Sequence, residues 1–155
     1  MAIDGIMLSA VKNDLTNAII GARINKIYQP ESKLLTVSLR QPGNDFKLLI
    51  SNHPQRPRVH LTELKFENPS QPPDFCMLLR KYLMNGTITE IKQPEFERVL
   101  YVEIERYDNF YYLILEIMGR YSNVILINEE QTVLDAMKRI TEDISSARQL
   151  YPGIP

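Results

Sequence analysis

Two strongly apolar runs near residue 120 constrain the fold more than any other part of this sequence. Residues 113–118 and 124–127 are each long enough for a buried strand, and the link between them consists of turn formers and polar donors with one cation, Arg120. The pattern predicts a tight hairpin in the middle of a sheet. Because the apolar residues are nearly continuous, we expect the hairpin to be covered on both faces, which leaves the turn as the part that can meet a partner.

The remaining elements follow from helical spacing and from alternation. Residues 6–20 form an amphipathic pattern, with Asp4 before it in the N-cap position and Gly21 after it. A second helix is predicted over 74–84, because prolines precede it and Asn85-Gly86 follow it. Elsewhere the apolar residues recur with a period of two, which predicts strands. These strands cover 23–28, 34–39, 46–51, 58–61, 88–91, 98–105, 111–118 and 123–128, with a last short run at 132–137.

The two halves of this pattern resemble each other. Residues 24–31 match residues 88–95 in their apolar spacing, and both contain Gln-Pro-Glu. Period-two strands align easily by chance, so the shared tripeptide is what favours an internal duplication. The sequence therefore predicts an α+β fold in which a helix-plus-four-strand unit occurs twice, giving two sheets of about eight strands in total, packed face to face with a helix at each end.

Charge and cysteine content exclude several classes of function. Lys and Arg number 18 against 19 for Asp and Glu, so the formal net charge is -1 and any anion site is local rather than global. The single cysteine, Cys76, excludes an internal disulfide and fits a reducing compartment. No apolar run approaches the ~20 residues that span a bilayer, and the start of the chain lacks the basic region of a signal peptide. We therefore expect a cytoplasmic protein with no membrane partner.

The domain organisation follows from length and composition. A chain of 155 residues with 44% hydrophobic residues fits one domain with its own core. After Lys138 the sequence becomes polar, which indicates a linker. We assign 1–138 to a single domain and 139–155 to a linker or extension toward further modules.

No arrangement of residues is typical of catalysis. His53 and His60 have no ligand spacing to Cys76 or to a carboxylate pair, so metal binding is not expected. No serine sits in a nucleophile elbow, and no glycine run is suited to cradle phosphates. We expect a binding module that is not an enzyme and that holds no metal or cofactor.

Charged side chains at the ends of predicted elements are the candidate binding residues, and each also has a simpler structural interpretation. Asp4 fits an N-cap that accepts from the first free amides of the helix. Glu97-Arg98 at a strand start fits a solvated ion pair that contributes little. Cations at element ends commonly complement a helix dipole or keep a turn soluble. The turn cations are Arg56, Arg58 and Arg120.

Five blocks of the sequence form a recognisable pattern: residues 3–5, 21–30, 58–62, 72–81 and 116–126. Together they resemble the NFACT family of bacterial ribosome quality-control factors, long named fibronectin-binding protein A. The resemblance extends over essentially the whole chain and corresponds to the family's N-terminal domain. Its most specific part is Met118-Gly119-Arg120 within the last block.

The resemblance implies a factor that binds the large ribosomal subunit still carrying peptidyl-tRNA and recruits alanyl-tRNA for template-free C-terminal alanine tailing. The N-terminal domain is then a tRNA-binding module, with rRNA as a further implied partner. The implied tRNA-binding residues are Asp4, Glu97 and Arg98, and the turn cations Arg120, Arg56 and Arg58 are candidates for secondary RNA contacts. This is the first of three hypotheses.

Two positions depart from the family pattern. Glu97 stands where aspartate is usual, so the side chain is one methylene longer with its charge kept. Tyr121 stands where a histidine is expected, which changes what the turn can donate.

The same resemblance implies a fold similar to the N-terminal domain of the formamidopyrimidine-DNA glycosylases (MutM), a two-sheet sandwich or pseudobarrel capped by two helices. Those enzymes attack through an N-terminal proline followed by glutamate, whereas this chain has Ala2-Ile3. Without that amine nucleophile the lyase chemistry has no starting group. The second hypothesis is a fibronectin- or fibrinogen-binding surface adhesin, which the family's older name suggests and the absent signal peptide disfavours. A DNA-repair enzyme is the third hypothesis, and the missing nucleophile disfavours it.

Overall fold

The structure, a computed structural model, describes residues 4–95 and 97–138. The expected linker at 139–155 lies outside the described residues. The elements are α1 (Gly5–Ile19), β1 (Arg23–Glu31), β2 (Leu34–Gln41), β3 (Asn44–Ser51), β4 (Arg58–Leu61), α2 (Asp74–Leu83), β5 (Thr87–Lys92), β6 (Val99–Arg106), β7 (Asn109–Glu116), the 3-10 turn η1 (Gly119–Tyr121), β8 (Asn123–Asn128) and β9 (Val133–Ala136). Every predicted helix and strand is present, and its ends lie within about three residues of the expected ones.

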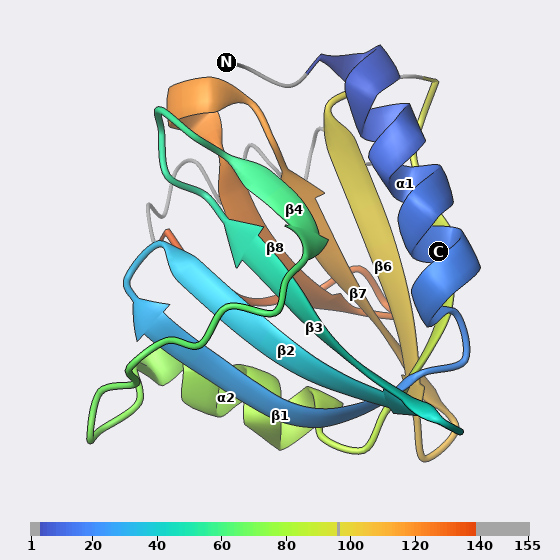
Figure 1. Cartoon of the computed structure of the whole chain (residues 1–155), viewed down its shortest axis with the longest axis vertical. Helices are drawn as coiled ribbons and strands as arrows, with labels where there is room; N and C mark the ends of the chain where they lie inside the picture. The colour runs from blue at the N-terminus through green and yellow to red at the C-terminus, as the bar shows by residue number, and fades with distance from the viewer. Residues whose placement is uncertain (1–3, 96, 139–155) are drawn as a thin grey trace.

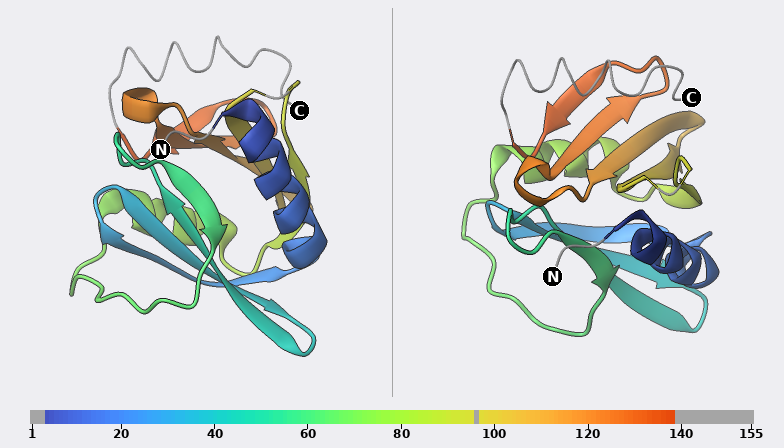
Figure 2. Two further views of the ribbon diagram at one scale, coloured as in Figure 1. Left: turned by 45° about the horizontal axis from the view of Figure 1, so that its top comes forward. Right: turned by 90° about the horizontal axis from the view of Figure 1, so that it is seen from above.

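All neighbouring strands are antiparallel, and the nine described strands form one sheet in the order β4-β3-β2-β1-β5-β6-β7-β8-β9. The prediction of two separate sheets is therefore wrong in this respect. β1 and β5 pair through a single register position, Arg23 opposite Thr87, and this short junction makes the two halves continuous. Figure 2 shows the sheet folded back on itself at the junction, with β1–β4 in one layer and β5–β9 in the other.

The junction has the twofold pattern that the sequence repeat predicts. Arg23 and Thr87 are 64 positions apart, the same offset as Gln29 and Gln93 in the two Gln-Pro-Glu copies, so corresponding positions of the repeat face each other. Both first strands are also irregular at the same place, between Ile24 and Lys26 and between Ile88 and Glu90. The backbone bonds come in counterpart pairs: Gly21 N–H to Ile88 O (2.7 Å) with Asn85 N–H to Ile24 O (2.9 Å), and Ile24 N–H to Gly86 O (2.8 Å) with Ile88 N–H to Ala22 O (2.9 Å).

The main core lies between the two layers and is closed by the helices. α1 packs against β4, β5 and β6, while α2 packs against β1, β6 and β9, so each helix contacts both layers. Burial of the apolar side chains between the two layers and under the helices is the main contribution that stabilises the fold. Neither described helix is long and apolar enough to cross a membrane. Fully buried side chains from both layers and both helices include Leu8, Ile19, Leu35, Ile50, Leu79 and Leu100.

The β7–β8 hairpin is covered on both faces, as its continuous apolar sequence predicts. Leu113 and Leu115 belong to the main core, whereas Ile114 and Ile125 belong to a second apolar cluster on the other face. The link is longer than a tight turn, because strand pairing ends at Glu116 opposite Asn123 and the chain makes the 3-10 turn η1 between them. The Ser122 hydroxyl accepts from the Met118 N–H (2.9 Å), which satisfies a donor that a two-residue hairpin would have paired. In this detail the prediction of a tight hairpin is wrong.

Candidate nucleic-acid interface

Asp4 is the N-cap of α1. Its Oδ1 accepts from the Met7 N–H (2.8 Å), and its backbone carbonyl accepts from the Leu8 N–H (3.0 Å). Asp4 itself has extended backbone angles (φ -94, ψ 176), as N-cap residues usually have. The capping role predicted from the sequence is confirmed. The side chain remains exposed, so a partner can also reach the carboxylate.

One side-chain amide joins the start of α1 to the segment that carries Glu97 and Arg98. Gln93 Nε2 donates to the Gly5 carbonyl (2.9 Å) and to the Glu97 carbonyl (2.6 Å). Both carbonyls therefore lie within hydrogen-bond distance of one nitrogen, although they are 92 positions apart in the chain. This bond places Asp4, Glu97 and Arg98 at one corner of the molecule.

The repeated Gln-Pro-Glu has a structural reason. In the first copy the Gln29 amide donates to the Ser32 carbonyl (3.1 Å), as the Gln93 amide does to Glu97 in the second. In each case the glutamine side chain bonds to a carbonyl three or four residues further along, in the bend that comes after the proline. Among the described residues, only the glutamine of the second copy also bonds to the start of a helix. The repeat thus supplies the bend in both halves, and one half uses it to assemble the corner.

Arg98 is exposed and directly precedes β6. Its carbonyl accepts from the Ile117 N–H (2.9 Å), so its backbone lies next to the chain that enters η1. The prediction that β6 begins at Arg98 is one residue early, since the strand starts at Val99. Because Arg98 stands before the strand, its side chain is not committed to packing on a face of the sheet.

The corner has mixed charge. Burial raises the pKa of Tyr101 to about 12, with smaller contributions from the negative charges of Glu97 and Glu116. The Tyr101 hydroxyl therefore keeps its proton at neutral pH. Exposed carboxylates at Asp4 and Glu97 accompany the Arg98 cation, so the corner offers hydrogen-bond acceptors together with one fixed positive charge.

The three turn cations lie at the same end of the molecule. The loop at 52–57 runs beside η1 in both Figure 1 and Figure 2, and the start of α1 is at this end too. Arg58 Nη1 donates to the Arg56 carbonyl (3.0 Å), and burial followed by the charge of Arg56 lowers the pKa of Arg58. Arg120 donates to the Tyr121 hydroxyl (2.9 Å), and its guanidinium carbon lies 5.0 Å from that ring's centroid. Their role in binding RNA stays a prediction.

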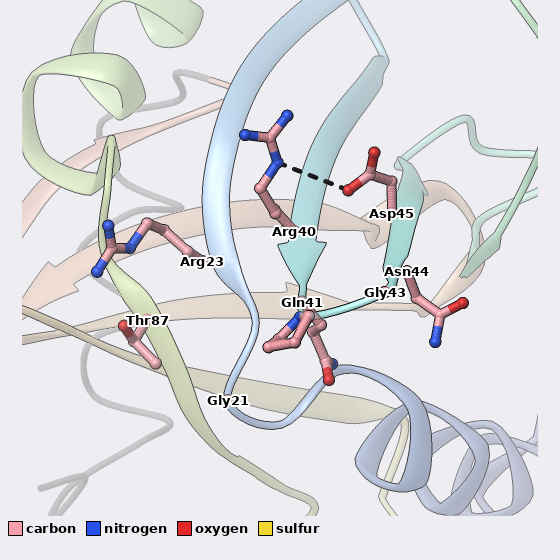
Figure 3. A pocket seen from close by; sticks show the side chains of 9 residues that line it. Gly21, Arg23, Arg40, Gln41, Gly43, Asn44, Asp45 and Thr87 are labelled. Carbon is pink, nitrogen blue, oxygen red and sulfur yellow. Dashed lines mark ion pairs between the residues drawn. The ribbon is translucent and has the colours of Figure 1, made fainter.

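A hollow of about 740 Å³ lies beside the C-terminal end of α1, away from the Asp4 corner, and the sequence patterns did not predict it (Figure 3). It is lined by the β2–β3 turn and by the first residues of β1 and β5, and none of the six predicted site residues lines it. The signals were present as Pro42-Gly43 and as two arginines in neighbouring strands, but sequence alone does not show which strands pair. Among the described residues, no three His, Cys, Asp or Glu side chains gather to hold a metal ion.

Residues 4–155 match the sequence model of the NFACT N-terminal and middle domains. The chain belongs to the NFACT family. Over 99% of its length it is 38% identical to a protein of Bacillus subtilis named Rqc2 homolog RqcH, of which it covers 28%. Over 95% it is 26% identical to the human ribosome quality control complex subunit NEMF, of which it covers 14%. This NFACT domain thus spans less than a third of the length of these relatives.

Solved structures of the family share this fold. The N-terminal domain of the fibronectin-binding protein PavA from Streptococcus pneumoniae superposes with a TM-score of 0.86 at 34% identity, covering 88% of this chain and 54% of that one. The N-terminal part of the fibronectin/fibrinogen-binding protein of Streptococcus suis also gives 0.86, at 36% identity, covering 90% and 54%. The family resemblance inferred from the sequence blocks is confirmed.

We expect Gln93→Ala to loosen the corner of this NFACT domain. Two carbonyl acceptors lose their shared donor, so the free energy of unfolding should fall by about 1–2 kcal/mol. Hydrogen exchange in the first turn of α1 should rise at the same time, and this can be followed by mass spectrometry. The matched control is Gln71→Ala, an exposed glutamine in the loop before α2. Equal exchange in the two variants would contradict the joining role of Gln93.

Proposed function

We propose that this domain is the tRNA-binding module of a ribosome-associated quality-control factor. In this proposal the full-length protein binds obstructed large ribosomal subunits in the cytoplasm, contacts their rRNA, and recruits alanyl-tRNA for template-free alanine tailing. The names of the bacterial and human relatives support the ribosome-associated part. The domain itself contributes binding and carries out no chemical step.

The observation that carries the proposal is the double hydrogen bond of Gln93, which brings Asp4, Glu97 and Arg98 together from distant parts of the chain. Arg98 supplies a guanidinium that is suited to a phosphate. The carboxylates of Asp4 and Glu97 accept from ribose 2'-hydroxyls or from base amino groups, which are donors that RNA exposes in unpaired regions. A phosphate contact and acceptor contacts at one corner match a folded RNA better than they match a single anion.

The two departures from the family pattern fit this use. Glu97 keeps the negative charge and extends it by one methylene, so the acceptor reaches further from the corner. Tyr121 is 65% exposed, and its hydroxyl accepts from Arg120, so the ring and the guanidinium present one surface on which a base can stack. The turn then contributes stacking where a histidine would contribute a ring N–H.

We further propose that the scaffold is the glycosylase-like (MutM-type) sandwich, used here for binding. Its support is the folding of the sheet into two layers with a helix closing each side. The fold and the twofold junction then provide a rigid frame for an RNA-binding corner rather than a lyase site.

The proposal is tested by isolating the full-length protein from its own cells and sequencing the RNA that co-purifies. We expect enrichment of tRNA and large-subunit rRNA, with alanine tRNA prominent. Recovery of ribosome-free protein that carries no tRNA would contradict the proposal.

Fibronectin or fibrinogen binding is the second candidate, because two structurally similar proteins bear those names. Its test is a direct binding measurement between the full-length protein and immobilised fibronectin. Fibronectin binding that survives Arg98→Ala, together with absence of tRNA from the purified protein, would favour this alternative.

A further inference from the structure

A row of charged residues crosses the sheet at the end opposite the Asp4 corner. Arg23 of β1 is directly opposite Arg40 of β2, and Arg40 is directly opposite Asp45 of β3. On its other side Arg23 faces Thr87 of β5. Directly opposed residues share a face of the sheet, and like charges in that arrangement repel each other. Two adjacent arginines at this position therefore favour an anion between them.

The carboxylate present neutralises little of this charge. Arg40 Nε lies 3.6 Å from Asp45 Oδ1, with the two side chains 66% and 75% exposed, so the pair is loose and solvated. Within the described ranges, no carboxylate oxygen lies within 4.0 Å of the Arg23 guanidinium. Figure 3 shows Arg40 turned toward Asp45, with Arg23 on the neighbouring strand beside Thr87. At least one full positive charge is thus unpaired in this row.

The row forms one wall of the hollow of about 740 Å³, and the β2–β3 turn forms the other. The turn is Pro42-Gly43, with Gln41 paired to Asn44 and Gly43 at φ +79, as in a type II turn. Apart from Gly43 itself and the two residues next to it in the chain, no described residue has an atom within 4 Å of the place where a Gly43 Cβ would stand, so this side of the turn backbone is open to a ligand.

The turn is held in place by α1. Gln41 Nε2 donates to the Ala18 carbonyl near the end of the helix (2.6 Å). This bond satisfies one of the carbonyls that a helix terminus leaves without an intrahelical partner. It also fixes the hairpin relative to β1 and β5, so the two walls of the hollow are preorganised.

We propose that this groove binds phosphate groups of an RNA strand. The two guanidiniums supply the charge, and the Thr87 hydroxyl and the Asn44 amide supply neutral donors on either side. The hollow is an open groove rather than an enclosed pocket, so it would leave most of a free nucleotide in water, whereas a strand passing across it gains from several phosphates. The inference rests on the proposed RNA-binding function and assigns it a second contact, at the end away from Asp4.

The test measures binding of the full-length protein to a tRNA and to a single-stranded RNA of about 12 nucleotides, over a series of salt concentrations. We expect the double variant Arg23→Gln/Arg40→Gln to bind the single-stranded RNA about tenfold more weakly, with a salt dependence smaller by about one to two phosphate contacts. Asp45→Asn is expected to bind a few-fold more tightly, because the competing carboxylate is removed. All three side chains are exposed, and thermal melting verifies that the variants remain folded.

The controls change the same charges elsewhere on the surface. Lys65→Gln and Glu63→Gln, both exposed in the loop before α2, should leave binding of the single-stranded RNA within about twofold of the wild type. The inference is overturned if the double variant binds like the wild type, if Lys65→Gln loses as much affinity, or if the wild type binds neither RNA. Binding of the short RNA without tRNA would contradict the proposed function alone, and the same variants would still decide the groove.

Discussion

Arg98→Ala is expected to lower the affinity of the full-length protein for tRNA by about tenfold and to reduce the salt dependence by about one phosphate contact. The side chain is exposed, and no described residue pairs with its guanidinium, so its removal takes away a ligand contact without leaving a buried group unpaired. For the same reason the free energy of unfolding should stay within about 0.5 kcal/mol of the wild type. Binding is measured by titration of a labelled tRNA at several salt concentrations.

The matched control is Lys65→Ala, which also removes one exposed cation but lies in the loop before α2. It should leave tRNA affinity within about twofold of the wild type. Recruitment of tRNA to purified blocked large subunits provides the second measurement. Unchanged recruitment by Arg98→Ala, with the protein folded, would remove the role assigned to this residue.

Gly86→Ala is expected to lower the free energy of unfolding by about 3 kcal/mol, because an added methyl overpacks the junction between the two halves. A Cβ at this position would stand 2.7 Å from Ile104 Cγ2 and 3.0 Å from the Leu83 carbonyl oxygen. Ile104 is 1% exposed, and the Leu83 carbonyl accepts from the Gly86 N–H (2.9 Å), so neither neighbour can move without disturbing the core or the end of α2. In a chain of this size the melting temperature should fall by roughly 6–12 °C.

Gly43→Ala is the comparison variant, since it adds the same methyl to a glycine with open space around it. Its cost comes from the positive φ of +79 alone and should be about 1 kcal/mol. Denaturant unfolding of both variants separates close packing from backbone strain. A smaller loss for Gly86→Ala than for Gly43→Ala would show that the junction tolerates extra volume.

Local sequence features determined most of the secondary structure. The N-cap at Asp4, the alternation in the strands and the continuous apolar runs of β7 and β8 act over a few residues, so they are legible without knowledge of the fold. The repeated Gln-Pro-Glu likewise predicted the internal repeat, and Arg23 facing Thr87 is its counterpart in the sheet. Family membership followed from sequence blocks that cover most of the chain.

Pairing between strands that are distant in the sequence decided the sheet topology and the composition of the candidate sites. The sequence did not show that β1 and β5 join the halves into one sheet, because a single register position with four backbone bonds leaves no periodic signal. The sequence indicated Asp4, Glu97 and Arg98 as individual candidates, but their proximity is shown by the two hydrogen bonds of the Gln93 amide. Arg23 and Arg40 were not among the predicted site residues, because they become neighbours only when β1 pairs with β2. Residue types and local patterns can be read from the sequence, and they predict the secondary structure. Which side chains become neighbours across strands depends on strand register, and register is set by the packing of the whole core.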